Sequence, residues 1–181
     1  MYVFIYLFIM KTLIISGSQS PDSRSFILCK EVQKRLKTKK DATVRFVDAR
    51  KLNITPFYHK QKADMDKIAK SVKWADNIIF GMGVHCYSVN SSLKAILDYS
   101  CDDATGKFFG IVCAAGGDRS YLSTMHLTQI CMNEWRMMQL PRIVYATGKA
   151  FDGNKVTSKD VLDRLDTFAS EFYTIGKKLL R

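Results

Sequence analysis

A serine-rich turn near the amino terminus carries a dense set of hydrogen-bond donors that could bind an anion. It runs Ser18-Gln19-Ser20-Pro21-Asp22-Ser23-Arg24-Ser25, directly after Gly17. Hydroxyls and a guanidinium could wrap a terminal monophosphate, and a helix starting there would add free N–H groups and the positive end of its dipole. The turn matches neither the Walker loop nor G-x-G-x-x-G, whose glycines bring the backbone close to a pyrophosphate. The alternative is a polar turn in which one serine only caps the helix.

Two later stretches could contact a flat ring. In Val84–Asn90 (VHCYSVN), a heteroaromatic ring could stack on His85 or Tyr87. Gly116-Gly117 would let the backbone run close along a ring edge. The alternatives are an exposed loop histidine, a Cys86 that packs as a small hydrophobe rather than acting as a nucleophile, and a double glycine that only makes a turn.

Strands alternating with helices would position these three stretches. The pattern predicts a parallel sheet with right-handed crossovers and helices on both faces, a three-layer α/β sandwich. Five strands at these intervals suit the flavodoxin-like order 2-1-3-4-5, whose ligand site lies outside the strand carboxyl ends. The predicted strands are 12–15, 43–47, 77–80, 108–113 and 143–146, and the predicted helices are 25–39, 64–74, 91–99, 121–138 and 156–180.

Length and composition indicate one globular domain over residues 10–181 of the 181-residue chain, with 47% hydrophobic and 25% charged residues. The formal net charge of +11 is compatible with anionic ligands, nucleic acid or an anionic membrane surface. Because the lysines are spread widely and no basic patch is interleaved with aromatic residues, we expect no nucleic-acid partner. Five scattered cysteines without a C-x-x-C pair predict reduced thiols, no zinc site and a cytoplasmic location.

Residues 1–9, MYVFIYLFI, form an apolar amino-terminal extension. They are too few to span a membrane and lack the basic region and cleavage site of a secretory signal, so we expect no stable membrane insertion. The interpretation we favour takes Met10 as the natural start. The alternatives are an additional β-strand segment or a tag that touches a membrane.

Taken together, the three stretches resemble the NADPH-dependent FMN reductase family of flavodoxin-like flavoproteins. The resemblance spans about Lys11 to Gly148, and the order and spacing of the motifs carry it. The family's G-S-x-x-x-x-S-R-S is matched by Gly17, Ser18, Ser23, Arg24 and Ser25. Its Y-S-x-x-x-x-L-K-x-x-x-D is matched by Tyr87, Ser88, Leu93, Lys94 and Asp98. Its A-G-G is matched by Ala115, Gly116 and Gly117.

The resemblance implies a role for each matched position. Ser18, Ser23 and Ser25 would hold the FMN phosphate, with Arg24 near it and Phe26 beside them. Val84, His85, Cys86, Tyr87 and Ser88 would lie against the ring system. Ala115, Gly116 and Gly117 would line its pyrimidine or dimethylbenzene side.

The implied activity is an oxidoreductase that passes a hydride from NADPH to flavin and then to free FMN, a quinone or another small electrophile. This transfer needs no side-chain acid or base, so we nominate no catalytic residue and no metal ligand. The resemblance also implies a homodimer or homotetramer. The alternative function is a flavodoxin-like electron carrier without its own substrate, but such carriers are usually acidic and this chain is basic.

Overall fold

The computed structural model of the chain describes residues 9–59 and 63–180. Seven strands form the main sheet, and two short strands form a separate hairpin. The strands are β1 (Met10–Ser16), β2 (Ala42–Asp48), β3 (Asn77–His85), β4 (Ser88–Val89), β5 (Phe108–Ala115), β6 (Met138–Gln139), β7 (Val144–Thr147), β8 (Phe151–Asp152) and β9 (Lys155–Val156). The helices are α1 (Arg24–Lys37), α2 (Ala63–Trp74), α3 (Ser91–Ser100), α4 (Thr124–Trp135) and α5 (Lys159–Leu179), with 3-10 turns η1 (Ala49–Lys51), η2 (Asp102–Ala104), η3 (Asp118–Ser123) and η4 (Gly148–Ala150).

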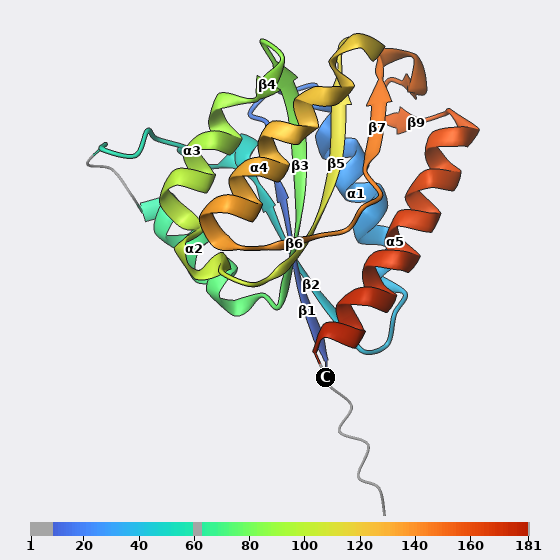
Figure 1. Cartoon of the computed structure of the whole chain (residues 1–181). Helices are drawn as coiled ribbons and strands as arrows, with labels where there is room; N and C mark the ends of the chain where they lie inside the picture. Colours follow the sequence, from blue (N-terminus) through green and yellow to red (C-terminus); the bar gives the residue numbers. More distant parts are fainter. Residues whose placement is uncertain (1–8, 60–62, 181) are drawn as a thin grey trace, which may run out of the picture.

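The central strands are parallel and run in the order β2, β1, β3, β5, β7 (Figure 1). This is the predicted order 2-1-3-4-5, so the flavodoxin-like prediction is confirmed. Thr12 pairs with Asn77, and Asn77 pairs with Phe108. Because the strands run in the same direction, their carboxyl ends meet at one edge of the sheet, where the three stretches follow β1, β3 and β5.

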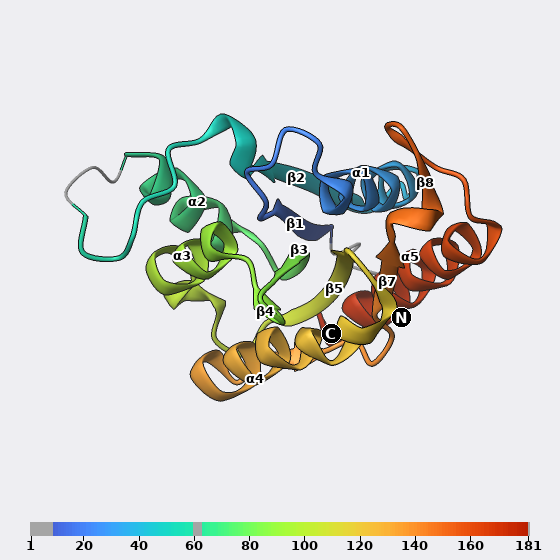
Figure 2. The same cartoon turned by 90° about the horizontal axis from the view of Figure 1, so that it is seen from above.

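Helices cover both faces of the sheet, with α1 and α5 on one face and α2, α3 and α4 on the other (Figure 2). The predicted strands 12–15, 77–80 and 108–113 are buried along their whole length, whereas β2 at the edge of the sheet is only partly buried. On α1, Leu28, Val32 and Leu36 recur at helical spacing and face the sheet. The sheet therefore has one apolar core on each side.

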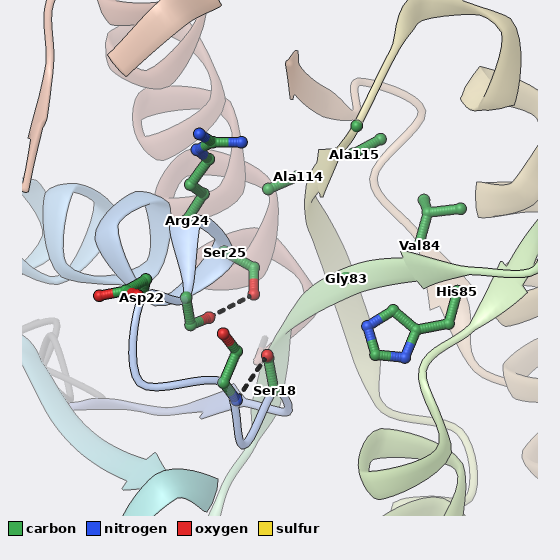
Figure 3. A pocket seen from close by; sticks show the side chains of 12 residues that line it. Ser18, Asp22, Arg24, Ser25, Gly83, Val84, His85, Ala114 and Ala115 are labelled. Carbon is green, nitrogen blue, oxygen red and sulfur yellow. Dashed lines mark hydrogen bonds between the residues drawn. The ribbon is translucent and has the colours of Figure 1, made fainter. Parts of the chain in front are cut away.

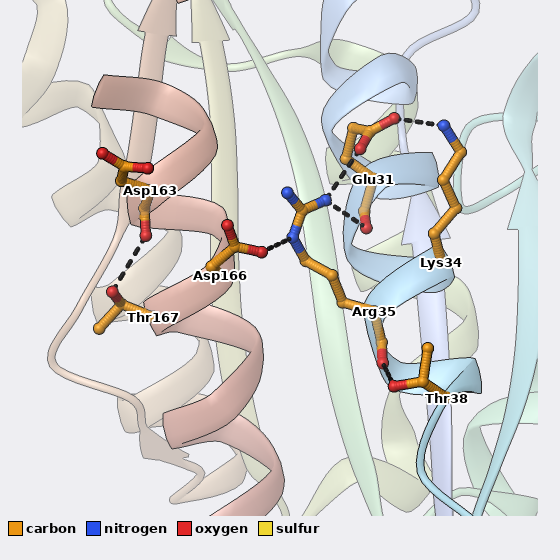
Figure 4. A network of polar contacts seen from close by, with 7 residues as sticks. All are labelled: Glu31, Lys34, Arg35, Thr38, Asp163, Asp166 and Thr167. Carbon is orange, nitrogen blue, oxygen red and sulfur yellow. Dashed lines mark hydrogen bonds and ion pairs between the residues drawn. The ribbon is translucent and has the colours of Figure 1, made fainter. Parts of the chain in front are cut away.

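A polar bridge joins the exposed sides of α1 and α5 (Figure 4). The Arg35 guanidinium donates to Glu31 on its own helix at 2.8 Å and to Asp166 on α5 at 2.6 Å. Ser23 caps the amino end of α1, because its Oγ accepts a hydrogen bond from the Phe26 N–H at 3.2 Å. Helix α1 is thus fixed along its length, and its amino end is the part that faces the predicted site.

Three predicted elements differ from the structure. Helix α4 does not span 121–138; Arg136 adopts a left-handed conformation with φ of 51° that ends it, and Met138–Gln139 then pairs with β5. The segment 84–90, which we expect from the sequence to be a loop after strand 77–80, instead contains a hairpin, because β3 continues to His85 and pairs antiparallel with β4. Helix α5 begins at Lys159 rather than 156, since β8 and β9 occupy the chain before it. Of residues 1–9, the first eight lie outside the described residues, so that prediction stays a prediction.

Candidate functional site

A small cavity of about 160 Å³ lies where β1 passes into α1. We call it the hydroxyl cavity. Ser18, Ser23 and Ser25 line it and are only 6%, 5% and 2% exposed. The remaining lining residues are Ser20, Asp22, Arg24, Gly83, Val84, His85, Ala114, Ala115 and Gly116. Figure 3 shows Ser18 and Ser25 on one side, with Val84 and His85 across from them.

The polar groups of the hydroxyl cavity are only partly engaged with one another. Ser23 Oγ lies 3.1 Å from Ser25 Oγ, and Ser18 Oγ accepts from the Ser20 N–H at 3.3 Å. At the first turn of α1, the N–H groups of Arg24 and Ser25 have no acceptor within the part of the chain that the structure describes. Buried hydroxyls beside free helix-terminal N–H groups suit a phosphate.

A buried amide holds the first two loops together. Asn90 is 1% exposed; its Oδ1 accepts from the Gly83 N–H at 3.0 Å, and its Nδ2 donates to the Gly17 carbonyl at 2.8 Å. The same Nδ2 also donates to Ser92 Oγ at 2.9 Å. Asn90 therefore sets the distance between the turn after β1 and the end of β3. It was not singled out in the sequence, because an asparagine before a helix carries no signal of such a long-range contact.

The first loop has a second support on its outer side. The Arg50 guanidinium donates twice to the Asp48 carboxylate, at 2.9 and 2.8 Å, and once to the Pro21 carbonyl at 3.4 Å. The hydrogen bond from Arg50 holds the pKa of the Asp48 carboxyl below its usual range. The serine turn is therefore braced by an ion pair at the end of β2.

A larger cavity of about 570 Å³ opens beside the first. We call it the glycine cavity. It shares Val84 and Gly116 with the hydroxyl cavity and is otherwise lined by Cys86, Tyr87, Gly117, Asp118, Arg119 and Ser120. A Cβ added at Gly116 or Gly117 would meet nothing within 4 Å, so open space lies beside both glycines. The two cavities are therefore neighbours, a small polar one and a wider one, with Val84 and Gly116 between them.

Tyr145, on β7, holds the third loop in place. Its hydroxyl donates to the Gly117 carbonyl and lies 2.9 Å from Ser120 Oγ. Its ring packs edge-on against Tyr121, with centroids 5.3 Å apart. A residue outside the predicted set therefore positions the glycine wall of the cavity.

The structure brings together eleven of the thirteen residues proposed for the site, because they line one cavity or the other. Phe26 lines neither; its ring packs edge-on against Phe46 at 5.7 Å and lies under the Arg50 guanidinium at 3.5 Å. Ser88 also lines neither, since its Oγ lies 2.9 Å from His126 Nδ1 on α4. Sequence reasoning did not single out Asp22, Gly83 and Ala114, which have no distinctive motif.

The Arg24 side chain lines the hydroxyl cavity but points away from the serine hydroxyls, as Figure 3 shows. Its guanidinium carbon lies 5.9 Å from the centroid of the Phe151 ring. Its Nη1 is so close to Gly148 that a Cβ there would be 3.0 Å away. The neutral donors, rather than this cation, thus form the inner surface of the cavity.

Cys86 is the exposed cysteine of the chain, which corrects the expectation that it packs as a small hydrophobe. The other four cysteines are buried free thiols, and burial raises the pKa of Cys113 and of Cys131 to about 12. Among the described residues, no cluster of three or more His, Cys, Asp or Glu side chains could hold a metal ion.

Comparison with known proteins gives the site a context. A family model described as NADPH-dependent FMN reductase matches residues 10–152. The chain belongs to this family. The NADPH-dependent FMN reductase family is flavin-dependent and takes its reducing equivalents from NAD(P)H, so the chain is an oxidoreductase. No curated protein matches the sequence.

Solved structures of flavin-dependent oxidoreductases share the fold. An NADH:FMN oxidoreductase (EMOB) in its apo form superposes with a TM-score of 0.78 and 17% identity, covering 91% of this chain and 89% of that one. The flavoenzyme NAD(P)H:(acceptor) oxidoreductase FerB from Paracoccus denitrificans has a TM-score of 0.73 and 17% identity, with 93% and 98% covered. An FMN-dependent NADH-azoreductase from Bacillus anthracis, in complex with FMN, has a TM-score of 0.65 and 17% identity, with 95% and 100% covered.

The residues of this FMN reductase family member fit FMN. The hydroxyl cavity offers donors of the kind that a phosphate monoester accepts, and the open space beside Gly116 and Gly117 suits a flat ring. No described helix is long and apolar enough to cross a membrane.

Proposed function

We propose that the chain binds FMN across the two cavities, oxidises NADPH, and reduces a small acceptor such as free FMN, a quinone or another electrophile. The observation that carries this proposal is the cavity lined by buried serines at the amino end of α1, which shares Val84 and Gly116 with the glycine cavity. When bound, FMN supplies the redox chemistry, because it can accept a hydride and pass on electrons.

The chain's own residues bind and orient. Ser18, Ser23, Ser25 and the first N–H groups of α1 hold the phosphate, and Arg24 adds positive charge at the rim. Val84 and His85 on β3, followed by Cys86, lie against the ring, and Ala115, Gly116 and Gly117 line its edge, while Tyr87 follows at the wide end of the site. Ser88 and Phe26 support this arrangement from outside through His126 and Phe46.

NADPH is proposed as the reductant because an exposed cation stands at the wide end of the site. Arg119 lines the glycine cavity, and within the described chain no carboxylate pairs with it. A free guanidinium there can bind the 2′-phosphate that distinguishes NADPH from NADH. Arg119→Ala should lower kcat/KM for NADPH by about tenfold, the value expected when one charged hydrogen bond is lost, and should leave NADH unchanged.

The experiment that tests the function is an absorbance spectrum. Purified protein is mixed with FMN, passed through a desalting column and treated anaerobically with NADPH or NADH. We expect a retained flavin band that NADPH bleaches, followed by reoxidation when a quinone or free FMN is added. Protein that stays colourless after FMN addition would contradict the proposal.

A homodimer is proposed from an exposed apolar face on η3 and α4. Leu122, Met125 and Met132 are 73%, 52% and 48% exposed, and Tyr121 beside them is 44% exposed. Contiguous apolar exposure of this kind marks an association surface. Sedimentation should show a dimer or tetramer that Leu122→Glu with Met125→Glu converts to monomer. We further propose a cytoplasmic location, where the exposed Cys86 would stay reduced.

A further inference from the structure

The turn between β3 and β4 contains two residues in an unfavourable backbone conformation. Val84 pairs with Val89 and His85 pairs with Ser88, which leaves Cys86 and Tyr87 as a two-residue turn. Their φ angles are 47° and 56°. A hairpin turn with both central residues in this region favours Asn-Gly, because larger side chains are strained there. The chain nevertheless has a cysteine and a tyrosine in this turn.

The turn cannot relax by shifting its register. Val89 is 9% exposed and belongs to the core, and Asn90 after it is fixed to Gly17 and Gly83. On the other side, Ser88 Oγ contacts His126 Nδ1 at 2.9 Å. With both ends of the hairpin held, the residue at position 87 takes the left-handed conformation, and glycine would do so without strain.

The Tyr87 side chain makes no contact that would account for this strain. It is 64% exposed, and within the described chain it has no hydrogen bond or ring contact. It lines the glycine cavity together with Gly116 and Gly117, and open space lies beside both glycines. An aromatic ring and a bare glycine backbone that line one cavity can together accept a flat ring.

The position of Tyr87 distinguishes between two possible ring ligands. The flavin phosphate is held in the hydroxyl cavity, so its ring must start near Val84 and Gly116, which both cavities share. Tyr87 lines the glycine cavity but not the hydroxyl cavity, and it therefore lies farther from the phosphate. A cavity of about 570 Å³ lies in the range of small-molecule sites.

Resting on the proposed function, we propose that Tyr87 determines acceptor specificity by stacking on flat aromatic electrophiles such as quinones. The strained turn is kept because it presents this ring at the mouth of the glycine cavity. Acceptors without an aromatic face, such as ferricyanide, gain nothing from it.

The test compares Tyr87→Gly with Tyr87→Phe in the FMN-loaded protein. 1,4-Naphthoquinone is titrated into the oxidised protein without NADPH, and its dissociation constant is measured by fluorescence. We expect Tyr87→Gly to raise this constant about tenfold, the value of one stacking contact, and Tyr87→Phe to stay within twofold of the parent. The ratio of kcat/KM for naphthoquinone to that for ferricyanide should fall about tenfold in Tyr87→Gly.

Tyr58→Ala is the matched control, because Tyr58 is a 93% exposed tyrosine that lines neither cavity. Tyr58→Ala should leave the dissociation constant for naphthoquinone and the ratio of the two kcat/KM values unchanged. The proposal is overturned if Tyr87→Gly stays within twofold, if Tyr87→Phe loses as much as Tyr87→Gly, or if FMN affinity falls in parallel. It is also overturned if Tyr87→Gly dissociates an oligomer, because the ring would then belong to an interface. A parent protein that binds no FMN would instead overturn the proposed function itself.

Discussion

The two ends of the site are built in opposite ways. Buried serines line the hydroxyl cavity, and the buried Asn90 beside it fixes one loop to the next through its hydrogen bonds. In the glycine cavity, Cys86, Tyr87, Gly116 and Gly117 are all exposed, and two of these residues lie in a strained turn. The buried end is suited to hold one constant chemical group, whereas the exposed end can accept different partners in turn. On this account, flavin affinity depends on the first end and acceptor choice on the second.

Breaking the buried end should have the largest effect. Asn90→Ala removes the Oδ1 that accepts from the Gly83 N–H and leaves the Gly17 carbonyl with one hydrogen bond fewer. Because these groups stay buried, we expect the free energy of unfolding to fall by about 2–4 kcal/mol and the FMN dissociation constant to rise more than tenfold. Urea unfolding and flavin fluorescence measure the two. Ser91→Ala, at the exposed next position, is the control, and an equal loss there would contradict the role given to Asn90.

Relieving the backbone strain at the exposed end should raise the free energy of unfolding rather than lower it. Cys86→Asn combined with Tyr87→Gly should raise the free energy of unfolding by about 1–3 kcal/mol, because both positions have positive φ. Arg136→Gly is the matched control, since Arg136 has φ of 51° at the end of α4 and lines neither cavity. It should gain similar stability without weakening naphthoquinone binding. A double variant that is less stable than the parent would refute the strain argument.

Loosening the third loop should give a smaller effect, confined to the wide end. Tyr145→Phe removes the hydrogen bond to the Gly117 carbonyl, so we expect a loss of about 1 kcal/mol in unfolding free energy and a few-fold slower flavin reduction by NADPH in stopped-flow measurements. Tyr173→Phe removes a comparable bond to Asp41, away from both cavities. Tyr173→Phe should lose similar stability with no change in the rate of flavin reduction. Equal slowing of flavin reduction in both variants would contradict the role given to Tyr145.

The smallest expected effect is on the pH dependence of the free energy of unfolding. Arg50 lowers the pKa of Asp48, so this pair stabilises the fold above the carboxyl's ordinary pKa near 3.8 and loses its contribution as pH falls through the lower folded value. Asp48→Asn should therefore cost about 1 kcal/mol at pH 7, and the difference from the parent should shrink below about pH 4. Unfolding curves between pH 3 and pH 7 measure this. A stability difference between parent and Asp48→Asn that is independent of pH would show that the ion pair of Asp48 with Arg50 does not cause it.

Much of the scaffold was predictable because it depends on local patterns. Apolar β-branched runs revealed the parallel strands, and their spacing led to the sheet order. The β3–β4 hairpin was missed because Cys86-Tyr87 is not a turn signal, and only the pairing of Val84 with Val89 reveals it. The end of α4 was missed because Arg136 is an ordinary helix residue that takes a left-handed conformation here.

The site was predictable where a motif marks it and not where tertiary contacts decide. The serine turn and the double glycine are visible as local composition. Asn90 and Tyr145 are not, because their roles depend on Gly17 and Gly117, which are distant in sequence. Phe26 directly follows one matched segment and Ser88 lies within another, yet their side chains pack toward β2 and α4. The direction in which a side chain beside a motif points can be known only from the folded structure.

Riboflavin is FMN without the phosphate, so it shows whether the buried serines bind that group. Dissociation constants for both flavins are measured on the parent and on Ser18→Ala with Ser25→Ala, two residues that line the hydroxyl cavity. We predict that the parent binds FMN at least a hundredfold more tightly than riboflavin, and that the double variant loses most of this preference while its riboflavin affinity is unchanged. Equal affinity of the parent for the two flavins, or a preference for FMN that survives the double substitution, would contradict the account.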